Sequence, residues 1–178
     1  MTSSDRHWYA AYVRSCQERN LSEKLTRLGV ENYVPVQKRR RQWSDRVKIV
    51  DVLVIPRVIF VRCTEGVRRQ VIKTFPDQFR FISEKGPYTP SVIPDEQMET
   101  FRRMVEYGTE KVKVLSEPLE KGDLVEIVNG PLKGRKCRLM KVGDKSCVGV
   151  NLGSFAAAAI EIPLSDVKKI DKNEQSDI

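Results

Sequence analysis

The sequence has few of the residues that build catalytic and metal sites. Its 178 residues include one histidine, His7, and four cysteines without a CxxC pair, so neither a zinc site nor a disulfide framework is indicated. A glycine-rich phosphate loop, a GxSxG sequence and carboxylates paired by spacing are also missing, which argues against an enzyme. We therefore expect no catalytic residue, no metal and no cofactor, and we interpret the cysteines as reduced core residues.

Long apolar runs are missing as well. None reaches the roughly 18 residues that a membrane span requires, and the polar start MTSSDRHWYA lacks the apolar core of a secretory signal. The sequence thus predicts a cytoplasmic protein with no membrane partner. A hydrophobic content of 40% over 178 residues is enough for one ordinary domain or two small ones.

Positive charge, by contrast, is abundant and concentrated. The formal charge is +8, and residues 38–73 hold 11 lysines and arginines against 3 acidic residues. Such a concentration attracts a polyanion, either nucleic acid or an acidic protein surface. The run from Lys38 to Arg41, followed by Trp43, favours an exposed hairpin arm that contacts nucleic acid. An acidic protein partner and a plain solvated tip remain the alternatives.

Hydrophobic periodicity predicts an α+β domain at the N-terminus, an antiparallel sheet with three helices. Strands are expected over 8–13, 31–36, 46–54, 58–61 and 79–82, with a break at Pro56. The first helix follows a capping box formed by Ser15 and Glu18 and ends at Gly29. The second is expected over 67–75, and the third begins at Pro94 and ends at Gly108.

The pattern changes after the third helix. Periodicity lapses over 109–118, as in a linker, and short strands then follow at 124–128, 137–142, 146–150, 160–162 and 167–170. Glycine turns between them predict a small antiparallel barrel. Ala156 to Ala159 are good helix formers where the barrel needs a strand, and we expect tertiary context to decide. The expected division is a domain at 1–107, a linker at 108–118, a barrel at 119–171 and a disordered tail at 172–178.

The barrel sequence GDLVEIVNGPLKG, residues 122–134, resembles a KOW motif. Trp8-Tyr9, Val34-Pro35, IPRVIFV at 55–61 and Ile93-Pro94-Asp95 are similar in order and spacing to the N-terminal domain of the NusG family. The resemblance covers nearly the whole chain, and its details are closer to specialised members, such as RfaH and the UpxY-like antiterminators of Bacteroides capsular polysaccharide operons. It implies an SH3-like KOW barrel and a role in transcription elongation or antitermination at specific operons.

The resemblance also implies a partner. In that family the N-terminal domain binds the clamp helices of the RNA polymerase β′ subunit and touches the β subunit, which reduces pausing and termination. On the matching positions, the clamp pocket comprises Tyr12, Ile55, Pro56, Val58 and Phe60. Alternation along the strand leaves Ile55 and Phe60 equally open to a core role. Arg57-Val58 replaces a glycine and an aromatic of many members, so the pocket should differ in shape.

The contact with the β subunit is implied for Arg68, Arg69 and Gln70. The helix dipole disfavours cations at a helix start, which supports a partner for the two arginines. Arg14 and Lys24 match positions that lie near the exposed non-template DNA in specialised members. The expected contacts with non-template DNA or nascent RNA are therefore Arg14, Lys24, Lys38, Arg39, Arg40 and Arg41.

The barrel departs from the family at its partner surface, which would comprise Leu132, Asn151, Leu152 and Gly153. General members present an apolar-aromatic pair there to Rho or to ribosomal protein S10. The resemblance therefore gives no support for Rho binding, leaves S10 open, and fits an antiterminator that acts as a monomer. A general factor that couples polymerase to Rho or the ribosome is one alternative. A ribosomal-type RNA-binding KOW protein is the other, although it leaves the N-terminal domain without a role.

Overall fold

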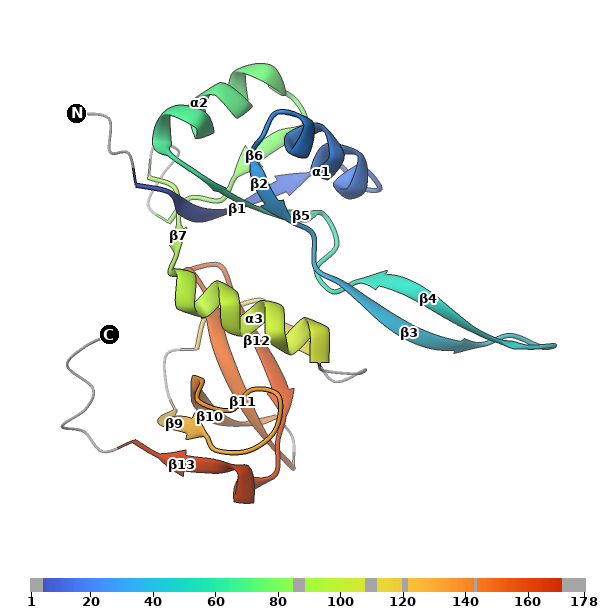
Figure 1. Cartoon of the computed structure of the whole chain (residues 1–178), viewed down its shortest axis with the longest axis vertical. Helices are drawn as coiled ribbons and strands as arrows, with labels where there is room; N and C mark the ends of the chain where they lie inside the picture. The colour runs from blue at the N-terminus through green and yellow to red at the C-terminus, as the bar shows by residue number, and fades with distance from the viewer. Residues whose placement is uncertain (1–4, 85–88, 108–111, 120–121, 143, 171–178) are drawn as a thin grey trace.

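The computed structural model describes residues 5–84, 89–107, 112–119, 122–142 and 144–170. An α+β domain is followed by an all-β barrel, which confirms the predicted fold class (Figure 1). Within these residues no helix is long and apolar enough to cross a membrane. The predicted helix end at Gly108, the turn at Gly143 and the tail at 172–178 lie outside the described residues.

The N-terminal sheet is antiparallel and has five strands. These are β1 (His7–Val13), β2 (Glu31–Tyr33), β5 (Val58–Cys63), β6 (Phe79–Phe81) and β7 (Val92–Ile93). They run in the order β2-β5-β1-β6, and β7 also pairs with β1. The helices α1 (Glu18–Arg27) and α2 (Glu65–Thr74) cover one face, and α3 (Asp95–Tyr107) covers the other (Figure 1). Because both faces are covered, β1 and β5 are apolar almost throughout.

Alternation along these strands separates two cores. Tyr9 and Ala11 of β1 pack with Leu21 and Leu25 of α1. Their neighbours Trp8 and Ala10 belong to the core on the α3 side, as do Val58 and Phe60 of β5. Successive strand residues point to opposite faces, so the sheet places every second apolar side chain on the side that faces α3.

The starts of the first two helices differ from the prediction. The capping box of Ser15 and Glu18 is wrong, because Gln17 occupies the N-cap without a side-chain bond. The Glu18 carboxylate instead accepts the backbone N–H of Arg57 at 2.8 Å. Arg57 has a positive φ of 64°, so this bond fixes an unfavourable backbone shape. Helix α2 begins two residues earlier than predicted because Thr64 caps it through the N–H of Val67.

A two-stranded hairpin projects from the sheet. It consists of β3 (Val36–Gln42) and β4 (Val47–Leu53), which pair with each other and with no other strand of the described residues. At the tip, the N–H of Trp43 donates to the carbonyl of Arg46 at 2.8 Å. The hairpin extends away from the body of the molecule (Figure 1). It is the exposed arm that the basic run predicts.

The barrel sheet has six strands in the order β13-β9-β10-β11-β12-β8. These are β8 (Lys113–Leu115), β9 (Asp123–Ile127), β10 (Lys136–Val142), β11 (Lys145–Leu152), β12 (Ala156–Glu161) and β13 (Val167–Lys169). The 3-10 turn η1 (Leu164–Asp166) precedes β13. β8 lies within the segment expected to be a linker, and it pairs with Ala157 to Ala159 of β12. The alanine run is a strand because β8 and β11 supply hydrogen-bond partners on both edges.

Candidate functional site

The sheet face toward α3 holds part of the predicted clamp pocket. Ile55, Val58 and Phe60 are buried, with exposed fractions of 8%, 2% and 0%. Tyr12 is 48% exposed, and Pro56 is exposed as well. The structure thus divides the five predicted residues into three that belong to a core and two that lie at the surface.

That core is shared between the two domains. The ring of Phe60 lies 5.6 Å from the ring of Phe101 on α3, and 6.4 Å from the ring of Phe155, which precedes β12. The same apolar cluster includes Val150 and Leu152 of β11. The barrel therefore packs against the face on which the clamp pocket is predicted.

The turn between β11 and β12 lies against Ser91 and β7 of the N-terminal domain. Gly153 has a φ of 62°, and a Cβ there would lie 2.6 Å from Oγ of Ser91 and 3.3 Å from Cγ1 of Ile93 on β7. Ser91 is buried, and its hydroxyl accepts the N–H of Ser154 at 3.1 Å and lies 2.9 Å from the Ser154 hydroxyl. A side chain at this position would require the Ser91 hydroxyl or the turn to shift, and the positive φ favours glycine.

Further contacts run along α3. Nη2 of Arg135 lies 3.4 Å from Oε1 of Glu99, and the same oxygen accepts from Arg103 at 3.0 Å. Leu132 is buried in the shared core. Asn151 binds the segment between β8 and β9: its side-chain amide accepts the N–H of Leu119 at 2.7 Å and donates to the Leu119 carbonyl at 3.2 Å. Of the four predicted partner residues, Leu132 and Leu152 are buried, and Gly153 is half-buried against Ser91.

The arginines at the start of α2 have a partner within the protein. Arg68 donates twice to the Glu65 carboxylate, each at 2.7 Å, and Arg69 donates once at 3.0 Å. The hydrogen bond from Arg68 lowers the pKa of Glu65 to about 2. Arg68 is buried over the ring of Phe81 at 5.4 Å. Glu65 precedes Arg68 by three residues and Arg69 by four, spacings that bring side chains of a helix together. These ion pairs, which the sequence already shows by spacing, account for both arginines without a contact to another protein.

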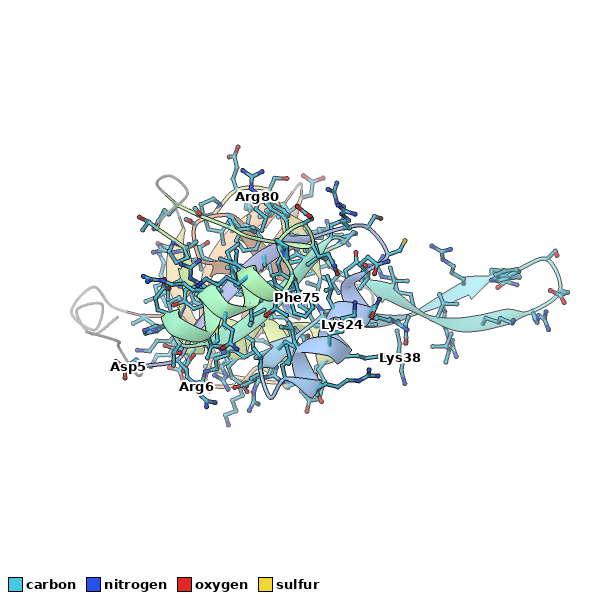
Figure 2. All side chains as sticks on the ribbon, turned by 90° about the horizontal axis from the view of Figure 1, so that it is seen from above. Asp5, Arg6, Lys24, Lys38, Phe75 and Arg80 are labelled. Carbon is cyan, nitrogen blue, oxygen red and sulfur yellow. The ribbon has the colours of Figure 1, made fainter. Side chains whose placement is uncertain are left out.

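Arg69 and Gln70 remain exposed on α2. They are the residues of the predicted β-subunit contact that a partner can reach. The predicted nucleic-acid residue Arg14 is also exposed, and Lys24 of α1 is half-buried. Figure 2 labels Lys24 on α1 and Lys38 where the hairpin leaves the body.

The hairpin carries charge that the protein does not neutralise. Its two acids each pair with an arginine outside the run of cations: Asp51 with Arg19 of α1 at 3.3 Å, and Asp45 with its neighbour Arg46 at the tip at 3.5 Å. Across the described residues, no acidic side chain forms an ion pair with the other hairpin cations, which are Lys38, Arg39, Arg40, Arg41 and Lys48. These five cations are available to an anion.

Sequence reasoning missed two sets of residues. Val47 and Ile49 of β4 are 54% and 66% exposed, although they belong to the apolar stretch predicted as a strand over 46–54. Both residues lie toward the tip of a hairpin whose strands, among the described residues, pair with no other strand, so the pattern alone is misleading here. Ser91 and Phe155 join the domains without any local signal, because such contacts depend on how the domains dock.

The cysteines are partly as predicted. Cys63, Cys137 and Cys147 are buried and free, and burial raises the pKa of Cys63 to about 11 and that of Cys137 to about 12. Cys16 is exposed, so the core interpretation is wrong for it. It precedes α1 with a φ of 63°, in a turn that points its side chain to solvent.

Comparison with known proteins identifies the family. The family model described as "Transcription termination factor nusG" matches residues 6–102, more than half of the 178-residue chain. No curated protein matches the chain. A solved structure titled "Domain interaction in Thermotoga maritima NusG" is similar, with 19% identity and a TM-score of 0.48 over 94% of this chain and 98% of that chain. The chain belongs to the NusG family, whose members are non-enzymatic transcription elongation and termination factors that bind RNA polymerase.

Proposed function

We propose that the protein is a cytoplasmic antitermination factor that serves specific operons and acts as a monomer. Its N-terminal domain, residues 1–107, binds the β′ clamp helices with the sheet face that carries Ile55, Val58 and Phe60, and with Tyr12 and Pro56 at the rim. Arg69 and Gln70 contact the β subunit on the other side. The domain thereby bridges the polymerase cleft and suppresses pausing or termination.

One observation carries this proposal. The apolar face of the sheet is closed partly by another domain, through Phe155 on Phe60 and Leu152 in the shared core. When such a domain leaves, it exposes an apolar patch, and patches of this kind mark protein partner sites. Among the described residues, few polar contacts hold the two domains together. They comprise the bonds between Ser91 and Ser154 and the half-exposed pair of Arg135 and Glu99.

On this proposal, the structure with the barrel packed against the N-terminal domain is a closed form of the protein. Barrel and polymerase compete for one face, so the barrel must leave before the clamp helices bind. Interfaces between domains of one chain resemble transient complexes and can separate. Release also frees Leu132, Leu152 and Gly153, which could then contact ribosomal protein S10. We do not expect Rho to bind, because Asn151 and Leu152 replace the apolar-aromatic pair.

Binding to polymerase is tested with the immobilised full-length chain and core RNA polymerase, or the isolated β′ clamp-helix fragment. Tyr12→Ala removes an exposed pocket residue without touching the core. Tyr107→Ala on α3 is the matched control, because the two tyrosines are similarly exposed, at 48% and 52%. We expect Tyr12→Ala to lower retention about tenfold, the loss of one interface side chain, and Tyr107→Ala to leave it unchanged. Equal retention by both variants would remove Tyr12 from the site.

Transcription reactions separate the alternatives. An antiterminator shortens pauses and increases read-through at a terminator. A general factor that couples polymerase to Rho would instead increase termination when Rho is present. A ribosomal-type protein would bind RNA, would not retain polymerase, and would change neither readout.

A further inference from the structure

The two faces of the hairpin differ in chemistry. Residues directly opposite each other in an antiparallel pair share a face. One face, here called the mixed face, places Arg40 opposite Ile49 and Gln42 opposite Val47. The other, here called the basic face, carries three cations toward the tip, with Arg41 directly opposite Lys48 and Arg39 opposite Val50, and Gln37 opposite Val52 nearer the base.

Two features of the hairpin are unfavourable in free energy while it has no partner. Like charges in a directly opposed pair destabilise a sheet, yet Arg41 and Lys48 occupy such a pair. Val47 and Ile49 lie open on the mixed face, 54% and 66% exposed. Within the described part of the chain the two strands pair with no third strand, and side chains extend from both faces of the projecting arm (Figure 2). An anionic partner that also offers apolar contacts would offset both costs.

The shape of the arm favours a double helix. Paired strands lie about 4.7–4.9 Å apart, and a two-stranded ribbon with its side chains fits the major groove of B-form DNA, which is about 12 Å wide. The major groove of A-form RNA is too deep and narrow for such a ribbon. Proteins that bind single strands stack the bases on several aromatic side chains. The arm has one aromatic residue, Trp43, and Nζ of Lys48 lies over its ring, 5.6 Å from the centroid.

We propose that the hairpin enters the major groove of double-stranded DNA. The mixed face meets the base edges, where Arg40 can pair with guanine, Gln42 with adenine, and Val47 and Ile49 with thymine methyl groups. The long side chains of the basic face reach the phosphates on the groove walls. The pair of Arg19 and Asp51 fixes the base of the arm against α1. This inference names the duplex partner of the proposed transcription factor and rests on that function only for its biological setting.

The first test uses fluorescence anisotropy with the full-length protein. The probes are a mixed-sequence DNA duplex of about two helical turns, the RNA duplex of the same sequence, and the single DNA strand. We expect the DNA duplex to bind at least about tenfold more tightly than the RNA duplex, because the ribbon cannot enter the A-form groove. Stronger binding of the single strand or of the RNA duplex would overturn the proposal and assign the arm to that ligand. Absence of binding to all three at low salt would overturn it in favour of a protein partner.

Salt dependence separates the two faces. Each phosphate contact contributes about −0.9 to the slope of log K against log salt. Arg41→Ala and Lys48→Ala should therefore each reduce the slope by about 0.9. Gln42→Ala and Ile49→Ser should weaken binding with the slope unchanged. Arg27→Ala on α1, a cation with 79% side-chain exposure, is the control and should alter neither. A slope that is the same in Arg41→Ala and Lys48→Ala as in the unaltered protein would refute the phosphate contacts.

A modified duplex tests the groove itself. Glucose attached through 5-hydroxymethylcytosine fills the major groove, since the C5 position faces that groove. We expect binding to fall at least about tenfold, the loss of the base-edge contacts. Undiminished binding would place the arm outside the major groove. If the unaltered protein retains polymerase but does not bind the unmodified duplex, only this inference is rejected. If it binds the duplex but does not retain polymerase, only the proposed polymerase function is rejected.

Discussion

Substitution of Gly153 by alanine should open the closed form. A Cβ at this position would lie 2.6 Å from Oγ of Ser91, so the two domains must move apart or Ser91 must rotate. Either movement sacrifices the two contacts between Ser91 and Ser154 at 2.9 and 3.1 Å. At about 0.5–1.5 kcal/mol for each hydrogen bond, the loss is about 1–3 kcal/mol. This corresponds to a shift of about 5- to 140-fold in the docking equilibrium.

A second glycine provides the control. Gly153 and Gly130 both have positive φ, 62° and 82°, but a Cβ on Gly130 would meet no atom within 4 Å. Alanine at either site therefore strains the barrel backbone by about 1–2 kcal/mol. Only Gly153→Ala adds a collision with the N-terminal domain. The difference between the two variants isolates the interface.

Fluorescence energy transfer between the domains measures the equilibrium. Cys16 is the exposed cysteine of the N-terminal domain, the other three are buried, and Lys168→Cys on exposed β13 supplies the second label. Transfer should fall for Gly153→Ala and remain unchanged for Gly130→Ala, while the same clamp-helix fragment binds Gly153→Ala more tightly. Equal transfer in the two variants, or opening without any gain in clamp binding, would refute the idea that the barrel covers the polymerase site.

Three further outcomes follow from the contacts described. Phe155→Ala should weaken the docking of the two domains by about 1–2 kcal/mol, the contribution of burying half of an aromatic ring. Unchanged energy transfer between the domains would contradict this. Glu65→Gln should cost about 1 kcal/mol at neutral pH, since solvent screens a carboxylate that is 35% exposed. Because pairing with Arg68 lowers the pKa of Glu65 from 4.5 to about 2, that stability is complete above pH 4.5 and lost as pH falls toward 2. Urea unfolding should thus show the two proteins converging in acid, and a constant gap would exclude the linkage. Finally, Cys16 alone should react rapidly with a thiol reagent at pH 8, because burial raises the pKa of Cys63, Cys137 and Cys147; a second fast thiol would show that a core cysteine is accessible.

Local signals in the sequence determined most of the N-terminal elements. Strand β1 and helix α1 follow from an apolar run and from leucines at helical spacing, Leu21 and Leu25, both of which are buried. The basic run predicted the exposed arm. These features depend on neighbours a few residues apart, and such neighbours are visible in the sequence. Membership of the NusG family is likewise carried by residues 6–102 in their order.

Local signals failed where distant groups compete for a side chain. Ser15 and Glu18 have the spacing of a capping box, but the N–H of Arg57, 39 residues away, takes the Glu18 carboxylate. The alanine run from Ala156 favours a helix by propensity. It forms a strand because β8 and β11 flank it in the fold.

The candidate site likewise could be predicted only in part from the sequence. The sequence named Ile55, Val58 and Phe60 through the family pattern, and alternation left open which of them a partner could reach. Only the tertiary structure placed Phe155 against Phe60 and Gly153 against Ser91. The docking of two domains depends on the shape and polarity of whole surfaces, which no run of neighbouring residues encodes. Sequence thus determined the family and the elements, and tertiary packing decided which faces are covered.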